Sequence, residues 1–200
     1  MSVKWTARAL TTTLTLALMT QPGFAATRAK HAAGSKRGAV AAAGAASPRK
    51  IDSIEKRGED VSAAVRLRFE PRVAALAQQV DLEGDANSAA LAERLASEFS
   101  TRPATLVSEH LSCGGSWGDL MIAHTLRANV RFTITVAQVC TLHRDGMGWT
   151  MVAHGLGLGV EPFVAAVENE SQVAIGQSRP DGKVPAIGPA GAENTSVNSN

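Results

Sequence analysis

The sequence lacks an apolar run long enough to cross a membrane, because a spanning helix needs about 20 residues. Its N-terminal apolar stretch, residues 9–19, has only about 11 residues and is diluted by threonines. Lys4 and Arg8 precede this stretch with no acid near them, and Pro22 follows it. Positive charge, apolar stretch and breaker in this order predict a secretory signal peptide over residues 1–25.

Small residues close the predicted signal peptide. Gly23 and Ala25 occupy the positions that a signal peptidase reads, so we expect cleavage after Ala25 or Ala26. The mature chain is then expected to be periplasmic or secreted, with no transmembrane segment. No cysteine follows the apolar stretch, which argues against a lipid anchor. The alternative is a buried amphipathic N-terminal helix.

Cysteine is scarce, with Cys113 and Cys140 as the two examples. An even number of cysteines in an exported chain favours a disulfide. The bridge would close a loop of about 27 residues and contribute roughly 3 kcal/mol to the free energy of unfolding. The alternative is a pair of free thiols, with Cys140 as a small buried apolar residue.

Acidic residues are absent from residues 27–50, whereas residues 51–200 hold all 18 acids against 12 Lys and Arg. The basic segment is rich in Ala, Gly and Ser and cannot build a core, which predicts a disordered linker over residues 26–50. It would be either a soluble spacer or a tether to anionic envelope components. Residues 177–200 turn to Gly, Pro, Asn and Ser, which predicts a disordered tail. The cations of the basic segment are Arg28, Lys30, Lys36, Arg37, Arg49 and Lys50.

Strand-like alternation is also rare, since only residues 130–136 show it, and we expect an extended connection there. Residues 51–176 instead repeat apolar positions every three or four residues, which predicts one small all-α domain. We expect a capping box at Asp52 to Glu55 and a kink or a new helix start at Pro71. A turn is expected at Gly84 and Asn87, with Ser88 as the cap of the helix that follows. Further helices are expected to start at Pro103, Thr135 and Pro162.

Part of this domain repeats, with residues 104–126 matching residues 137–156 in spacing. Each copy has a helix ending near a histidine, a Gly-containing turn that reaches a tryptophan, and an apolar-Ala-His-x-Leu helix. The tryptophans are Trp117 and Trp149, which we expect to plug the turns. The pattern predicts two helix-turn-helix-like units that pack on each other.

Residues 135–149, Thr-Val-Ala-Gln-Val-Cys-Thr-Leu-His-Arg-Asp-Gly-Met-Gly-Trp, and residues 152–158, Val-Ala-His-Gly-Leu-Gly-Leu, carry a resemblance. They resemble a group of exported bacterial proteins of unknown activity with a Gly-x-Gly-Trp turn and an Ile/Val-Ala-His-x-Leu-Gly-Leu helix. The match covers about 70 residues, near 101–170, and implies architecture and export only. The same segment is similar to cytoplasmic helix-turn-helix domains.

Binding to DNA would require the last helix, residues 160–170, to enter the major groove. That helix carries Glu161, Glu168 and Glu170 and has no Lys or Arg. Phosphates would repel it, because their neutralisation by cations supplies most of the binding energy. We therefore expect no nucleic-acid partner.

Residues 114–118 fit Gly-x-Ser-x-Gly, the nucleophile elbow of α/β-hydrolases, with Ser116 as the nucleophile. An elbow needs a strand before the serine, and residues 106–111 have a helical pattern instead. The alternative interpretation is a glycine-rich turn between helices. The partners of a catalytic Ser116 would be Asp119 or Asp145 and His143 or His154.

Four histidines could bind zinc or copper if they converged: His110, His124, His143 and His154. They are spaced 14 and 11 residues apart within the two copies, and no His-x-x-x-His pair occurs. A histidine on an apolar helix face is more often a hydrogen-bonded core residue, so we expect neither a metal nor another cofactor.

Taken together, the residues favour an exported, non-catalytic interaction module, associated with the envelope or secreted. The alternatives are a serine hydrolase using Ser116, a metal-binding protein using the histidines, and a DNA-binding helix-turn-helix protein.

Overall fold

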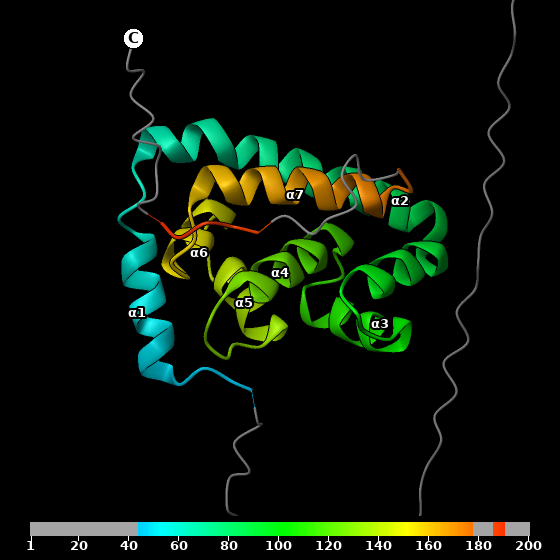
Figure 1. Ribbon diagram of the computed structural model, residues 1–200, viewed down its shortest axis with the longest axis horizontal. Helices are drawn as coiled ribbons and strands as arrows, with labels where there is room; N and C mark the ends of the chain where they lie inside the picture. The colour runs from blue at the N-terminus through cyan, green and yellow to red at the C-terminus, as the bar shows by residue number, and fades with distance from the viewer. Residues whose placement is uncertain (1–43, 178–185, 191–200) are drawn as a thin grey trace, which may run out of the picture. The chain divides into compact units, whose positions relative to one another are not determined.

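Helices form the regular structure of this chain in its computed structural model, which describes residues 44–177 and 186–190. In these ranges there are seven helices and no strand, which confirms the all-α prediction. No helix of the described part is both long and apolar enough to cross a membrane. The helices are α1 (Pro48–Gly58), α2 (Ala63–Glu98), α3 (Pro103–Ser112), α4 (Trp117–Asn129), α5 (Val136–Arg144), α6 (Trp149–Gly155) and α7 (Val160–Ala174) (Figure 1).

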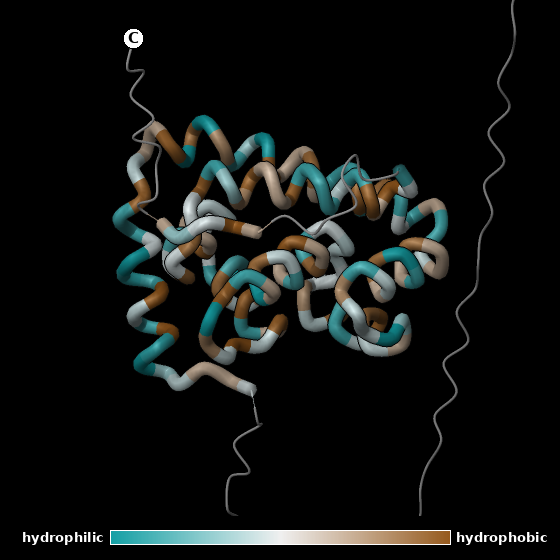
Figure 2. The backbone as a smooth tube through the Cα atoms, in the orientation of Figure 1, coloured by the Kyte–Doolittle hydropathy of each residue, from teal (hydrophilic) through white to brown (hydrophobic). Residues whose placement is uncertain are grey.

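The long helix α2 organises the packing, since α7, α4, α3 and α6 all pack against it. Figure 1 shows α7 running alongside α2, with α1 standing beside α6. Helix α4 lies at the centre and also contacts α5 and α7. Hydrophobic and hydrophilic stretches alternate along α2 and α7 in Figure 2, as expected for helices with one apolar face. The core includes fully buried side chains such as Phe163 and Leu120.

Helix α2 passes through Pro71, so the predicted start of a new helix at that residue is wrong. The irregularity lies at Asn87, whose φ of −156° and ψ of 73° are not helical. The side-chain Oδ1 of Asn87 accepts a hydrogen bond from the backbone N–H of Ala90 at 3.2 Å. Asn87 therefore caps the second part of α2, the role predicted for Ser88, and Gly84 is buried within the helix instead of forming a turn.

The folded part begins earlier than predicted, so the linker prediction is wrong for residues 44–50. Helix α1 starts at Pro48 after Ser47, and the expected capping box at Asp52 lies inside the helix. The backbone of Ala46 exchanges two hydrogen bonds of 2.9 Å with the side chain of Gln138 on α5. These bonds anchor the chain before α1. The rest of the predicted linker and the predicted signal peptide lie outside the described residues.

Part of the predicted tail also packs on the domain. Leu158 forms an antiparallel bridge with Pro189, and Ile187 is buried. The N–H of Gly159 donates to the carbonyl of Gly188 at 2.8 Å. The disordered-tail prediction is therefore wrong for residues 186–190, while residues 178–185 and 191–200 lie outside the described part.

Local sequence features placed other boundaries well. Pro103 is the first residue of α3, and Thr135 caps α5 through a capping box with Gln138. Helix α7 begins at Val160, two residues before the predicted Pro162. Residues 130–135 form a connection without regular structure between α4 and α5, as predicted for the single strand-like segment.

Candidate functional site

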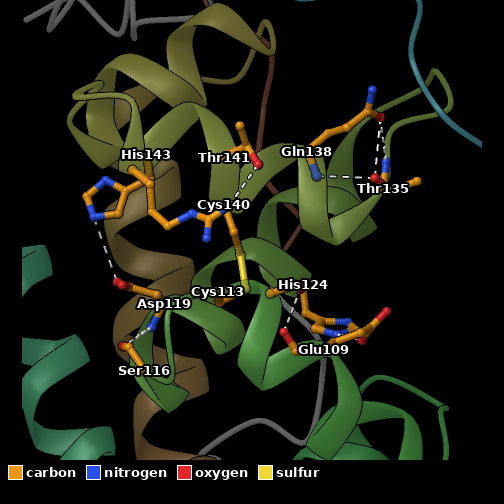
Figure 3. The surroundings of a disulfide bond; sticks show 12 residues. Glu109, Cys113, Ser116, Asp119, His124, Thr135, Gln138, Cys140, Thr141 and His143 are labelled. Carbon is orange, nitrogen blue, oxygen red and sulfur yellow. Dashed lines mark hydrogen bonds and ion pairs between the residues drawn. A yellow bond between two sulfur atoms is a disulfide. The ribbon is translucent and has the colours of Figure 1, made fainter. Parts of the chain in front are cut away.

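A disulfide joins the two segments whose sequences repeat, residues 104–126 (the first unit) and residues 137–156 (the second unit). Cys113 follows the end of α3 and Cys140 lies in α5, and their Cα atoms are 5.1 Å apart (Figure 3). Both cysteines are almost completely buried. The structure thus confirms that the predicted pair lies at disulfide distance, and the bond ties the turn of the first unit to the helix of the second.

Ser116 is the N-cap of α4. Its Oγ accepts a hydrogen bond from the backbone N–H of Asp119 at 2.9 Å. The same hydroxyl lies 3.1 Å from both carboxylate oxygens of Asp81 and donates its proton to that carboxylate. Asp81 Oδ1 also accepts from the backbone N–H of Gly118 at 2.9 Å. The hydroxyl therefore accepts from the start of α4 and donates to a carboxylate of α2.

The backbone around Ser116 differs from a nucleophile elbow. Helix α3 precedes the serine, and the connection passes through Gly114 and Gly115, whose φ angles of 77° and 82° favour glycine. An elbow requires a strand at this place. Among the described residues, no histidine hydrogen-bonds to Ser116, so the structure brings no Ser–His pair together here.

His143 and Trp149 form a stacked pair at the turn before α6, with ring centroids 4.1 Å apart. His143 Nδ1 lies 2.9 Å from the carbonyl oxygen of Met147, which can only accept, so Nδ1 carries a proton. His143 Nε2 lies 3.9 Å from Asp119 Oδ1. Trp149 Nε1–H donates to the same oxygen at 3.2 Å. Asp119 thus connects the two units, as Figure 3 shows for its approach to His143.

Burial raises the pKa of the Asp119 carboxyl above its usual value, while His143 and the hydrogen bond from Trp149 act in the opposite direction. The neighbouring charge of Asp81 raises this pKa further. Asp119 is therefore held by His143 of α5, by Trp149 at the start of α6 and by Ser116 at the start of its own helix. It is not placed to orient a histidine toward Ser116.

The first unit repeats the stacked pair. His110 lies on Trp117 with ring centroids 4.3 Å apart and the planes 20° from parallel. In both units the tryptophan is the first residue of a helix and is buried, as expected for residues that plug the turns. Both stacks join the end of one helix to the start of the next.

Two carboxylates of α2 serve the two units in the same way. Asp81 accepts from the start of α4, and Glu70 accepts from the start of α6. The Glu70 carboxylate receives the backbone N–H groups of Trp149 and Thr150 at 3.1 and 2.8 Å and the Thr150 hydroxyl at 2.6 Å. A negative charge at a helix N-terminus is favourable, because the N–H groups there point outward unpaired.

No sequence pattern marked these two carboxylates as functional residues. Glu70 and Asp81 are 11 residues apart on α2, which places them on one face three helical turns apart. Both acids and their spacing are visible in the sequence. The spacing acquires meaning only when the starts of α4 and α6 are known to lie on this face of α2.

His124 of α4 is buried, with 4% of its side chain exposed. Its ring stacks on Phe99 with centroids 4.8 Å apart, and its Nε2 lies 2.8 Å from Glu109 Oε2. Burial lowers the pKa of His124, and the Glu109 carboxylate partly offsets this effect. His124 therefore connects α4 to α3.

The four histidines do not converge in the described structure. His110 and His143 stack on different tryptophans, His124 pairs with Glu109, and His154 is half-buried in α6. The described residues contain no group of three His, Cys, Asp or Glu side chains that could hold a metal ion.

Helix α7, the counterpart of a recognition helix, lies against the core through Phe163, Val164 and Val167. Two of its acids face α2, where Glu161 is 3.5 Å from Arg68 and Glu168 pairs with Arg72, and the third, Glu170, is buried. The helix thus uses its charged side chains in contacts within the domain. This geometry does not resemble the presentation of a helix to a DNA groove.

Comparison with known proteins adds no relative. No family model, no curated protein and no solved structure matches this chain. The resemblance of residues 101–170 to exported bacterial proteins therefore stays a prediction.

The lowered pKa of His124 predicts a pH dependence of stability. The unfolded chain takes up a proton near the ordinary pKa of 6.5, whereas the folded chain does so only at lower pH. The free energy of unfolding should therefore decrease as the pH falls from about 7 to about 5. Urea unfolding at several pH values should show a shallower decrease in His124→Gln than in the natural protein.

The matched control is His154→Gln, which removes an imidazole from a different helix and keeps the His124–Glu109 pair. Its free energy of unfolding should decrease with falling pH as much as that of the natural protein. Equal slopes in His124→Gln and the natural protein would contradict the role assigned to His124.

Proposed function

We propose that this protein is an exported, non-catalytic interaction module of the cell envelope or the secreted fraction. The order of charge, apolar stretch and small residues over residues 1–25 supports export. The Cys113–Cys140 disulfide is consistent with an oxidising compartment. N-terminal sequencing of the exported chain tests this half of the proposal, with Ala26 or Thr27 expected as the first residue.

The arrangement of Ser116 is the observation that favours binding over catalysis. A serine nucleophile needs a base that removes its proton when it attacks. Here the hydroxyl donates to Asp81 and accepts from the N–H of Asp119, while Asp81 itself holds the start of α4. These contacts explain why Ser116, Asp81 and Asp119 occur together without assigning them a reaction.

A serine-reactive fluorophosphonate probe tests the non-catalytic proposal. We expect no labelling that depends on Ser116, because its hydroxyl is engaged as a helix cap. Labelling of the natural protein that disappears in Ser116→Ala would instead establish the serine-hydrolase alternative. Ser112→Ala is the matched control, since the Ser112 hydroxyl donates to the Glu109 carbonyl one helix earlier.

The partner that we propose is an anionic component of the envelope, approached through the basic segment over residues 26–50. The segment is rich in cations and free of acids from residue 27 onward. Its last two cations, Arg49 and Lys50, lie on α1 and belong to the folded domain. The acidic exposed residues of α7 argue against nucleic acid as the partner.

A further inference from the structure

A cleft of about 300 Å³ lies beside α1, where the chain leaves α4 and where residues 186–190 return to the domain. Three cations line it: Lys50 and Arg57 from α1 and Arg131 from the connection after α4. No acidic side chain lines the cleft. Its remaining walls are mostly apolar and include Phe132 and Ile187.

The three cations are not neutralised within the described part of the chain. None of the ion pairs between described residues involves Lys50, Arg57 or Arg131. The ammonium of Lys50 lies 4.1 Å from the centre of the Phe132 ring, which holds it at the cleft without cancelling its charge. Three unneutralised cations in one concave site create a positive potential that attracts anions.

The position of Arg57 depends on a glycine. Gly157 follows α6 with a φ of 88°, and a Cβ atom at this residue would lie 3.2 Å from Arg57 Nη1. The absence of a side chain thus leaves room for the guanidinium at the mouth of the cleft. The Gly157 carbonyl accepts from the N–H of Ala190 at 2.9 Å, which fixes the turn.

The opposite wall is held by hydrogen bonds as well. The backbone N–H of Ile187 donates to Asn129 Oδ1 at 2.9 Å, and Asn129 Nδ2 donates to the carbonyl of Thr125 at 2.8 Å. The end of α4 and the returning segment are therefore connected. Because these hydrogen bonds already hold the wall in place, little conformational entropy is lost when a ligand binds. The cleft is therefore preorganised for a ligand.

We propose that this cleft binds the phosphate group of a small organic phosphate; the proposal rests on the function of the protein as a binding module. A phosphate carries up to two negative charges and accepts paired hydrogen bonds from guanidinium groups, which suits Arg57 and Arg131. Lys50 adds a third charge. The apolar walls at Phe132 and Ile187 fit the organic part, and the volume lies at the lower end for small-molecule sites.

Calorimetric titration of the full mature chain with phenyl phosphate tests the proposal at low ionic strength. We expect saturable binding that weakens as salt is added. Arg57→Gln and Arg131→Gln should each weaken it about tenfold or more, because each removes charge-assisted hydrogen bonds. Arg102→Gln is the matched control: it removes the same charge from an exposed residue before α3 and should leave the affinity unchanged.

The location of binding is read from the amide resonances of Gly157 and Ile187, which should shift with phenyl phosphate in the natural protein. Folding of each variant is checked by its urea midpoint. No saturable binding at millimolar phenyl phosphate, or equal weakening by Arg102→Gln, would overturn the cleft proposal.

Two further measurements complete the test. The first distinguishes a soluble phosphate from a lipid headgroup, and the second distinguishes failure of the cleft proposal from failure of the non-catalytic function. Flotation with phosphatidylcholine vesicles that contain phosphatidic acid should be equal for the natural protein and Arg131→Gln if the cleft binds a small soluble phosphate, because attraction through the basic segment does not involve Arg131. Flotation that Arg131→Gln reduces would overturn the small-ligand assignment. Release of phenol by the natural protein would overturn the non-catalytic function, whereas binding without release supports both proposals.

Discussion

Reducing the Cys113–Cys140 disulfide should lower the free energy of unfolding by roughly 3 kcal/mol, because the bond closes a loop with a sequence separation of 27 residues. An open loop gives the unfolded chain more conformations, while the packing of the folded chain is unchanged. Urea unfolding with and without dithiothreitol measures the difference. For a domain of this size the loss is a large fraction of the total stability.

The double variant Cys113→Ala/Cys140→Ala is the control for this prediction. It should unfold near the midpoint of the reduced natural protein and should not respond to dithiothreitol. A natural protein whose urea midpoint is the same in both conditions would contradict the structural role of the bond.

Gly118→Ala should destabilise the protein by about 2 to 3 kcal/mol, although alanine is the better helix former. Gly118 lies in the first turn of α4, where this helix crosses α2. A Cβ atom there would overlap the carbonyl oxygen of Ala77 and lie 2.6 Å from its carbonyl carbon. Backbone atoms of a packed helix cannot turn away as a side chain can, so the two helices must separate. Urea unfolding measures the cost.

Helix propensity alone predicts the opposite sign for Gly118→Ala. The comparison is Ala165→Gly at an exposed position in the middle of α7, which should cost about 1 kcal/mol through propensity alone. A stabilised Gly118→Ala protein would show that α2 and α4 are free to adjust. It would contradict the close approach seen between Gly118 and Ala77.

Local chemistry explains which features were predictable from the sequence. The apolar repeats of residues 51–176 placed the helices, because burial of one face every three or four residues is a property of neighbouring residues. Thr135 was predicted as a cap from its own residue type, and its partner in the structure, Gln138, lies only three residues away. Pro71 shows the limit of such local rules. A proline inside a helix is expected to kink or end it, yet α2 continues through Pro71, and α2 packs against α7.

The candidate site was only partly predictable. Cys113, Cys140, Ser116 and the histidines were all identified as residues of interest, but their roles depended on neighbours far away in the chain. Ser116 matched a five-residue catalytic pattern, and its structural role follows from Asp81, which lies 35 residues earlier. A short pattern defines a residue type and its spacing, and it contains no information about the side chain that approaches from another helix.

The sequence by itself determined the helical class, the caps that act over three residues, and the charge difference between the basic segment and the remainder. Tertiary structure alone decided where the domain begins and ends, because Gln138 holds Ala46 and Asn129 holds Ile187 across long stretches of chain. It also brought Lys50, Arg57 and Arg131 into one cleft. The physical reason is that periodicity and capping act between near neighbours, whereas a shared cleft requires elements distant in sequence to pack together.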